Sequence, residues 1–558
     1  RAGRSKESRA LAYTLCKGNP HDQQVFAEPL WPFNTKIPAP NVALNSERLV
    51  QRHINAILLS DFLCNEVGEA QKDKHVLTTG WFFEKSADGS LCERFMDYLK
   101  GSGSTDLDRA LESAVKGTGL HGRNASQLRI DASDAMEKLR KRWLEVFEYL
   151  EREKSSAQND SPYAKRIEVE QRRHMGEYLL RDLAARTFLP GYGFPTDVVN
   201  FDNFTIEDYV RTQKQKEQKK DREDNISRYK GLPSRNLAIA IREYAPGAEI
   251  VMDGRVFRSA GVSLHWHNIA ADSNEAQKFD SAWRCDQCGE LEYKEGVYDS
   301  GNLACTSCGT EIKKSNIKRV LVPAGFVTDA YEKTTNNVEQ QKYIPVQQPW
   351  VIVKDAPQVA LPDPALGFMR SGPDGMVFHH SDGEFKNGFA VCMQCGRAHS
   401  MDRHGEFPHE LNTSRPHRSP RPTKDDRYEE NGRPQIADCG GQGALHTNIT
   451  LGAHSKTDVF ELVLRRPISN EYLIDDGENG TNRSIAMTLA VALRFALAAQ
   501  LGVSAPELGY SVRPAKIDNR SVLVIQLYDE LSGGAGFASS AAEHIEDTLQ
   551  KMVKQLEC

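Results

Sequence analysis

The chain has 558 residues, of which 39% are hydrophobic and 27% are charged, and its formal net charge is −6. At roughly 150 residues per domain this length gives about three or four domains, and the composition excludes fibrous and largely disordered proteins. The longest apolar run, residues 485–503, is rich in alanine and is interrupted by Arg494 and Gln500. We therefore expect a buried helix there and no membrane-spanning segment.

The chain begins with the basic segment Arg-Ala-Gly-Arg, and residues 8–16 have the pattern of a strand. Together they resemble the last signature motif of superfamily 2 helicases, Gln-x-x-Gly-Arg-x-Gly-Arg, and the closing strands of the second RecA-like lobe. The resemblance implies that residues 1–40 end that lobe and that the chain begins inside the motif. Arg1 and Arg4 would then reach the γ-phosphate of ATP held on the other lobe, where a permanent positive charge offsets charge on the transferred group. A basic segment without a catalytic role is the alternative.

We predict a helical region over residues 41–235. Asn45 or Ser46 caps a first helix with helical spacing of its apolar residues. Residues 126–189 show the same periodicity and are expected to form two long helices separated by a proline-containing break. Residues 213–235 are dense in charge and almost without apolar residues, which predicts an exposed helix or a linker.

Basic residues on the predicted helices allow two interpretations. They are Arg48, Arg52 and His53 on the first helix and Arg140 and Lys141 on the second. Either these side chains contact the phosphates of a nucleic acid, or they lie on a solvated helix face.

Two phrases beside the charged segment extend the resemblance. Residues 189–197, Leu-Pro-Gly-Tyr-Gly-Phe-Pro-Thr-Asp, and residues 237–249 are similar to phrases of helicases related to the mitomycin repair factor. The phage-defence helicases of the Druantia and DISARM systems share this arrangement. The second phrase leads into a β-hairpin that turns at Asp253 and Gly254. We expect residues 236–360 to form a small β-rich domain.

Two C-x-x-C-G hooks, separated by sixteen residues, carry Cys285, Cys288, Cys305 and Cys308. The two-residue gap directs both sulfurs of a hook to one metal, and the glycine permits a tight turn. Two hooks at this spacing predict a four-thiolate Zn²⁺ ribbon, a closed site with a structural role. Disulfides or free thiols are the alternative. Such hooks without an export signal indicate a reducing, cytoplasmic setting.

A second group consists of Cys392 and Cys395, in another C-x-x-C-G hook, and Cys439. It resembles the zinc-binding C-terminal domain of mitomycin-repair-type helicases, where a cysteine cluster precedes a Leu-Gly-x-x-x-x-Thr-Asp phrase. Here that phrase occupies residues 451–458. The resemblance implies a second structural zinc.

The second group has no fourth cysteine nearby, so we expect a histidine to complete it. His417 is the first choice, followed by His446 and then His399. An incomplete site, in which Cys439 is a buried thiol, is the alternative.

A proline-stiffened basic loop covers residues 415–424. Arg418 and Arg421 in this loop are candidates for contact with phosphate or with a partner protein. An unstructured surface loop would have the same composition.

Residues after 458 follow an α/β pattern, with strands over 459–464 and 521–528 and a helix over 483–501. This pattern matches the C-terminal domain of unknown function in the same helicases. We therefore take residues 361–558 as a second zinc-bearing region with a C-terminal α/β domain.

The last predicted strand ends in two acidic residues and the glycine-rich turn Gly533–Phe537. Such a turn between a strand and a helix can hold phosphate. Alternatively, Asp529 and Glu530, with Glu507 as a third candidate, can bind the metal of a nuclease. Ordinary packing between a strand and a helix accounts for the same residues.

The resemblance covers nearly the whole chain and implies a multidomain α/β protein. Its parts are the end of a RecA-like lobe, a helical region, a β-rich zinc-ribbon domain and a C-terminal zinc-bearing α/β domain. It implies the C-terminal accessory region of an ATP-dependent DNA helicase or translocase in phage defence or DNA repair. The expected partner is DNA, single-stranded or at a duplex junction. Family members continue into further cysteines beyond the position of Cys558.

The sequence contains neither a G-x-x-x-x-G-K-[ST] motif nor an acidic helicase box. The intact helicase would bind ATP and Mg²⁺, but this chain alone is not expected to hydrolyse ATP. The alternative function is a zinc-dependent scaffold that joins defence or repair subunits without catalysis of its own.

Overall fold

The structure is a computed structural model. The described residues are 13, 15, 20–34, 44, 47–70, 77–85, 89–101, 104–156, 171, 174–191, 198–203, 205, 233–264, 279–294, 303–339, 341–353, 356–421, 436–466, 468–477 and 480–557. Arg1 and Arg4, the predicted helix break near residue 160, most of the predicted linker, and Cys558 lie outside them.

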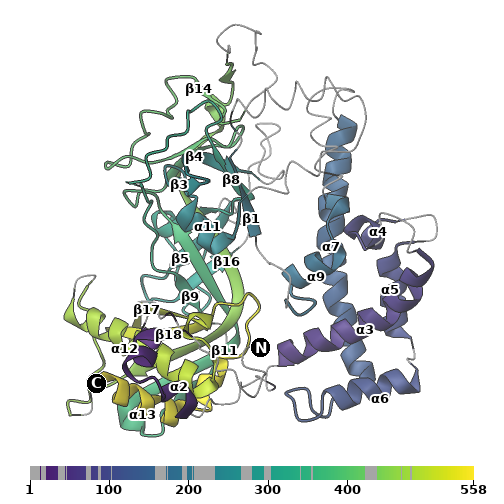
Figure 1. The fold of residues 1–558 in the computed structure, drawn as a ribbon, viewed down its shortest axis with the longest axis vertical. Coiled ribbons are helices and arrows are strands. Elements are labelled where there is room, and N and C mark those ends of the chain that lie inside the picture. Colours follow the sequence, from purple (N-terminus) through teal and green to yellow (C-terminus); the bar gives the residue numbers. More distant parts are fainter. Residues whose placement is uncertain are drawn as a thin grey trace, which may run out of the picture.

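The helical region is organised around one long helix, α7 (Ala125–Ser156), against which shorter helices pack (Figure 1). The predicted apolar stripe of this helix is buried, and Trp143 at its centre stacks on Phe83 with ring centroids 5.4 Å apart. The core is therefore formed by one face of α7 and the helices around it. The other helices of this region in the described residues are α3 (Glu47–Ala70), α4 (Thr79–Phe83), α5 (Leu91–Lys100), α6 (Thr105–Ala114) and α9 (Leu179–Ala185). Two short helices, α1 (Pro20–Ala27) and α2 (Trp31–Asn34), precede this region in the chain.

A five-stranded sheet follows, with the strand order β2-β1-β8-β4-β3. The predicted hairpin is present, because β3 and β4 pair antiparallel and both turn residues, Asp253 and Gly254, have positive φ angles of 49° and 71°. The elements are β1 (Val198–Asp202), β2 (Ser234–Asn236), α11 (Leu237–Glu243), β3 (Glu249–Met252), β4 (Arg255–Ser263) and β8 (Gly325–Thr328).

An eleven-stranded sheet contains both the ribbon strands and the C-terminal strands (Figure 1). Its two longest strands, β11 (Gly367–Ser381) and β16 (Leu445–Leu464), pair antiparallel along most of their lengths. The other strands are β5 (Asp280–Arg284), β6 (Leu291–Lys294), β7 (Ile317–Leu321), β9 (Trp350–Ile352), β10 (Gln358–Ala360), β12 (Phe389–Cys392), β13 (Ala398–Ser400), β17 (Leu508–Ile517) and β18 (Arg520–Asp529).

We predicted separate domains over residues 236–360 and 361–558, but the large sheet contains strands from both segments. Strand β7 pairs in parallel with β16 through Arg319 and Ile449. The backbone hydrogen bonds of the zinc ribbon thus continue into the C-terminal strands, so the two segments share one sheet.

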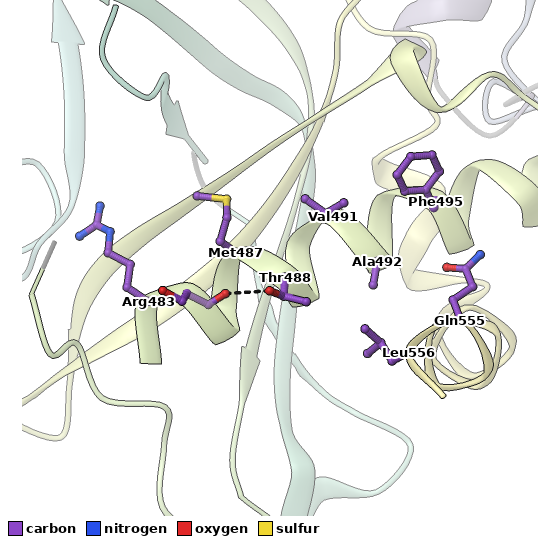
Figure 2. A pocket seen from close by; sticks show the side chains of 9 residues that line it. Arg483, Met487, Thr488, Val491, Ala492, Phe495, Gln555 and Leu556 are labelled. Carbon is purple, nitrogen blue, oxygen red and sulfur yellow. Dashed lines mark hydrogen bonds between the residues drawn. The ribbon is translucent and has the colours of Figure 1, made fainter. Parts of the chain in front are cut away.

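Helix α12 (Thr481–Leu501) packs on β17 and β18, and helix α13 (Ile545–Leu556) packs on α12, around an alanine-rich core. Among the described helices, α12 is the one that is long and apolar enough to cross a membrane, a test that a core helix also passes. Eight of its side chains are buried in the structure. Figure 2 shows its opposite side, where Met487, Val491 and Phe495 line an open groove of about 760 Å³ with Leu556 of α13.

A buried ion pair lies inside the large sheet. Nε of Arg513 on β17 donates to Oε1 of Glu461 on β16 at 2.9 Å, and both side chains are almost fully buried. Arg370 donates to the other carboxylate oxygen of Glu461, Oε2, at 3.2 Å. The Gln526 amide on β18 donates to Oε1 at 2.7 Å. Burial alone would raise the pKa of Glu461, but the two arginines hold it below its ordinary value.

Arg513→Met tests how much the fold depends on this pair. The substitution leaves the Glu461 carboxylate buried with less positive charge, so we expect the free energy of unfolding to fall by about 3–5 kcal/mol. Urea denaturation of the zinc-saturated protein, followed by circular dichroism, measures the change. Lys516→Met, at an exposed position of the same strand, is the control, and equal effects of the two substitutions would contradict the prediction.

Candidate metal centres

All three cysteine hooks have the same backbone geometry. In each, the amide of the first cysteine donates to the carbonyl five residues later, and the glycine amide donates back to the first cysteine, at 2.8–2.9 Å. The hook glycines, Gly289, Gly309 and Gly396, have φ angles of 74°, 70° and 80°. A positive φ favours glycine, so the sequence C-x-x-C-G specifies this turn directly.

The first candidate centre brings together Cys285, Cys288, Cys305 and Cys308, as the spacing indicates. The Sγ atoms of Cys285 and Cys308 are 3.6 Å apart, as are those of Cys288 and Cys305. Four thiolates at about 2.3 Å from a tetrahedral Zn²⁺ have neighbouring sulfurs about 3.8 Å apart. The cysteines are not joined by disulfides. The donor set and its spacing therefore fit Zn²⁺.

The first hook is held against the C-terminal part of the sheet. The backbone amide of Lys516 on β17 donates to the Cys288 carbonyl at 3.2 Å, and a Cβ on Gly289 would lie 3.0 Å from Cα of Ala515. The second hook faces outward, since Cys308 is exposed and a Cβ on Gly309 would meet no atom within 4 Å. The ribbon is thus fixed through one hook.

Glu290, which directly follows the first hook, was not identified from the sequence as a contributor to the site. Its Oε2 lies 3.8 Å from the buried Arg513, and the Gly289 carbonyl lies 3.5 Å from another nitrogen of the same guanidinium. The ion pair inside the sheet therefore extends to the zinc hook. An acidic residue immediately after C-x-x-C-G is the signal, but its partner is more than 200 residues away in the sequence.

The second candidate centre brings together Cys392, Cys395, Cys439 and His417. The sulfurs of Cys392 and Cys439 are 4.0 Å apart, and Cys395 Sγ is 3.5 Å from Nε2 of His417. A sulfur and a nitrogen bound to one tetrahedral Zn²⁺ are about 3.6 Å apart, so this set also fits zinc.

A short ladder places His417 in the second centre. Strands β14 (His417–Arg418) and β15 (Asp438–Cys439) pair so that His417 lies directly opposite Cys439. The other two histidines lie elsewhere: Nδ1 of His446 is 3.4 Å from Arg319, and His399 is half-buried on β13. Of the three histidines considered from the sequence, the structure brings His417 to the cysteines.

The second centre connects the two sheets. The amide of Val262 on β4 donates to the carbonyl of Gly396 at 2.8 Å, and a Cβ on Gly261 or on Gly396 would overlap the opposing backbone. The hook therefore packs directly on the five-stranded sheet, and glycine is required on both sides of the contact.

The predicted nucleic-acid residues are in different environments. Arg140 donates to Glu93 at 2.5 Å and is mostly buried, whereas Lys141 is exposed. Arg421 pairs with Asp202 at 3.3 Å, and the Arg418 side chain is exposed.

The predicted roles of Arg48 and Arg52 need correction. Both donate to the carbonyl of Gly533, and Arg52 is 5% exposed. In the structure these side chains neither lie on a solvated face nor are available to phosphate, because a distant turn of the same chain occupies them.

The geometry of the glycine-rich turn after β18 favours neither a phosphate site nor a nuclease metal site. Its amides donate to the chain's own carboxylates: Ala535, Phe537 and Ala538 to Asp529, and Gly536 to Asp458. These donors are not available to a phosphate, and the oxygens of Asp529 are satisfied without a metal. Glu507 caps the short turn before β17 through Ser504. The geometry supports ordinary packing between a strand and a helix.

Both centres supply four donors to one metal, which leaves no ligand position for water or substrate. We expect two zinc atoms per chain, measured by atomic emission on purified protein, with one atom lost in Cys288→Ser. A total of one atom in the wild-type protein would contradict the second centre.

His417→Ala tests the fourth ligand. Loss of the imidazole opens the second centre, so a competing chelating dye should remove one zinc atom from this variant at concentrations that leave the wild type intact. His446→Ala is the matched control, because His446 lies outside the centre. Equal zinc release from both variants would remove His417 from the ligand set.

Comparison with known proteins finds a family match in the C-terminal segment of the chain. Residues 489–558 match the family described as the MrfA Zn-binding domain. Both cysteine groups precede that segment, which contains one cysteine, Cys558. The whole chain aligns with the Druantia protein DruE of Escherichia coli (strain UMEA 4076-1) at 25% identity and spans 30% of its length.

Among solved structures, the DUF1998 helicase MrfA bound to DNA matches 73% of this chain and 34% of its own, at 10% identity. The TM-score of this match, 0.27, is too low to establish a common overall fold. The sequence matches support a relationship to the C-terminal region of MrfA-type helicases.

Proposed function

We propose that this chain is the zinc-stabilised DNA-binding accessory region of an ATP-dependent helicase or translocase that acts in phage defence or DNA repair. The proposal rests on one observation. The segment that matches the MrfA Zn-binding domain, residues 489–558, is connected through the large sheet to both metal centres. Strand β17 of that segment contacts the first hook, and β16, which pairs with β18, also pairs with the strand that bears Cys392.

The metal ions in this proposal have a structural role. Zinc supplies a fixed geometry at each centre, and the residues around it do the positioning. The Cys285–Cys308 centre holds the ribbon on β17, and the Cys392–Cys439 centre holds the two sheets together. A platform fixed in this way can keep a bound strand in one orientation. ATP and Mg²⁺ would bind elsewhere in the intact protein, with Arg1 and Arg4 reaching the γ-phosphate.

DNA, single-stranded or at a junction, is the proposed partner. Lys141, Arg418 and Arg421 are the predicted contact residues with exposed side chains, and Arg421 pairs with Asp202. Lys141 and Arg418 are therefore the first to test. Reduced cysteine ligands suit the cytoplasm, where we place the protein.

A scaffold that joins subunits is the second candidate, and one observation favours it. Arg140 and Arg421, two of the four predicted DNA contacts, are paired with Glu93 and Asp202. A phosphate would have to replace a carboxylate at each position, which reduces the gain from binding.

Salt-dependent binding separates the two functions. We expect a labelled oligothymidine to bind the zinc-loaded chain, with log K falling linearly with log salt at a slope of about −0.7 per phosphate contacted. The double variant Lys141→Glu/Arg418→Glu should bind more weakly with a shallower slope, while Lys116→Glu, an exposed lysine between α6 and α7, should not change binding. Absence of binding at low salt would favour the scaffold.

The motor assignment requires the full-length protein. Arg4→Ala should reduce DNA-stimulated ATP hydrolysis by about 10³-fold or more if Arg4 contacts the transferred phosphoryl group. Arg9→Ala, a nearby basic residue outside the motif, is the control. An unchanged ATPase rate in Arg4→Ala would remove the arginine-finger role.

A further inference from the structure

Helix α3 and the turn after β18 are in direct contact, although they are more than 480 residues apart in the sequence. Arg48 and Arg52 lie one helical turn apart on α3 and so face the same way. Both guanidinium groups donate to the carbonyl oxygen of Gly533, at 2.8 Å and 2.6 Å. Arg48 also lies 3.9 Å from a carboxylate oxygen of Asp458.

The turn is shaped so that this carbonyl is available. Asp529 accepts hydrogen bonds from the amides of Ala535, Phe537 and Ala538 at 2.6–3.1 Å, which folds the turn back over the end of β18. The amide of Gly533 also has a partner, because it donates to the backbone carbonyl of Lys456 at 2.7 Å. The amide groups of the turn thus face the sheet, while the Gly533 carbonyl faces α3.

Two glycines of the turn are required by this arrangement. Gly533 and Gly534 have φ angles of 88° and 72°. A Cβ on Gly533 would overlap the guanidinium of Arg52, and a Cβ on Gly534 would overlap the Asp458 carboxylate. Backbone conformation and side-chain space both select glycine at these positions.

Charge also favours the contact. Burial, followed by the neighbouring Asp458 carboxylate, raises the pKa of Asp529 to about 7, against the effect of the three amides. Burial likewise raises the pKa of Asp458, and Arg48 opposes that shift. Two buried acids side by side are costly without positive charge nearby, and α3 supplies it.

The apolar cores of the two parts of the chain are separate. In the described residues, the core of the helical region is made of residues 50–189, while the core under α12 and α13 is made of residues 361–552. The arginine contact is therefore a polar connection between two regions, each with its own hydrophobic core.

We propose that Arg48 and Arg52 and the Gly533–Phe537 turn form a latch that fixes the helical region on the C-terminal sheet. Movement of α3 is then transmitted to the sheet that carries the zinc ribbon. The latch requires neither DNA nor ATP, so it stands independently of the function proposed above.

The test compares two glycine variants of the full chain. Gly533→Ala places a methyl group where Arg52 binds, whereas Gly477→Ala, at a φ of 94° with no atom within 4 Å of the added Cβ, imposes backbone strain alone. We expect Gly533→Ala to increase hydrogen exchange of the amides of residues 533–538 at least tenfold, and to increase the radius of gyration measured by X-ray scattering. Gly477→Ala should leave both unchanged.

A second variant guards against simple misfolding. Arg48→Gln/Arg52→Gln removes the charges without altering the turn and should give the same two changes, with two zinc atoms retained as proof that the sheets are folded. The latch is overturned if both variants keep the wild-type scattering curve and amide protection, or if Gly477→Ala produces the same changes as Gly533→Ala.

Discussion

The buried pairing of Arg513 with Glu461 is the contact on which the arrangement of the molecule depends. It joins adjacent parts of the large sheet from within, and through Glu290 and the Gly289 carbonyl it reaches the first zinc hook. Removing either partner would leave a buried charge with less compensation. The packing of the sheet and the position of the first hook are therefore linked, which fixes the orientation of the ribbon on the sheet.

The two four-donor metal sites add to this contact, one within a local fold and the other between distant parts of the chain. The first is closed by cysteines within 24 residues of each other and stabilises a local fold, while the second draws on residues from 392 to 439 and lies against β4. A small ribbon has little apolar surface to bury, so metal–ligand bonds replace part of a hydrophobic core.

Local patterns explain what was predictable from the sequence. The hooks, the hairpin turn at Asp253 and the stripe of α7 depend on neighbours within a few residues, so spacing alone indicates them. The parallel pairing of Arg319 with Ile449, and the contact of Arg52 with Gly533, depend on residues that are distant in sequence. Neither periodicity nor composition carries that information. Similarly, spacing ranked three histidines without deciding among them, and a two-residue ladder opposite Cys439 distinguishes His417.

The parallel pairing of β7 with β16 has a consequence for how the chain folds. The first hook pair closes a short loop, whose entropy cost is small. The sheet that receives it is complete only after β16 has been made, about 130 residues later, and long-range pairings of this kind form slowly. During synthesis the ribbon is thus able to bind its metal while β7 still presents an unpaired edge. Until β16 has been made, that edge is exposed to pairing with other chains.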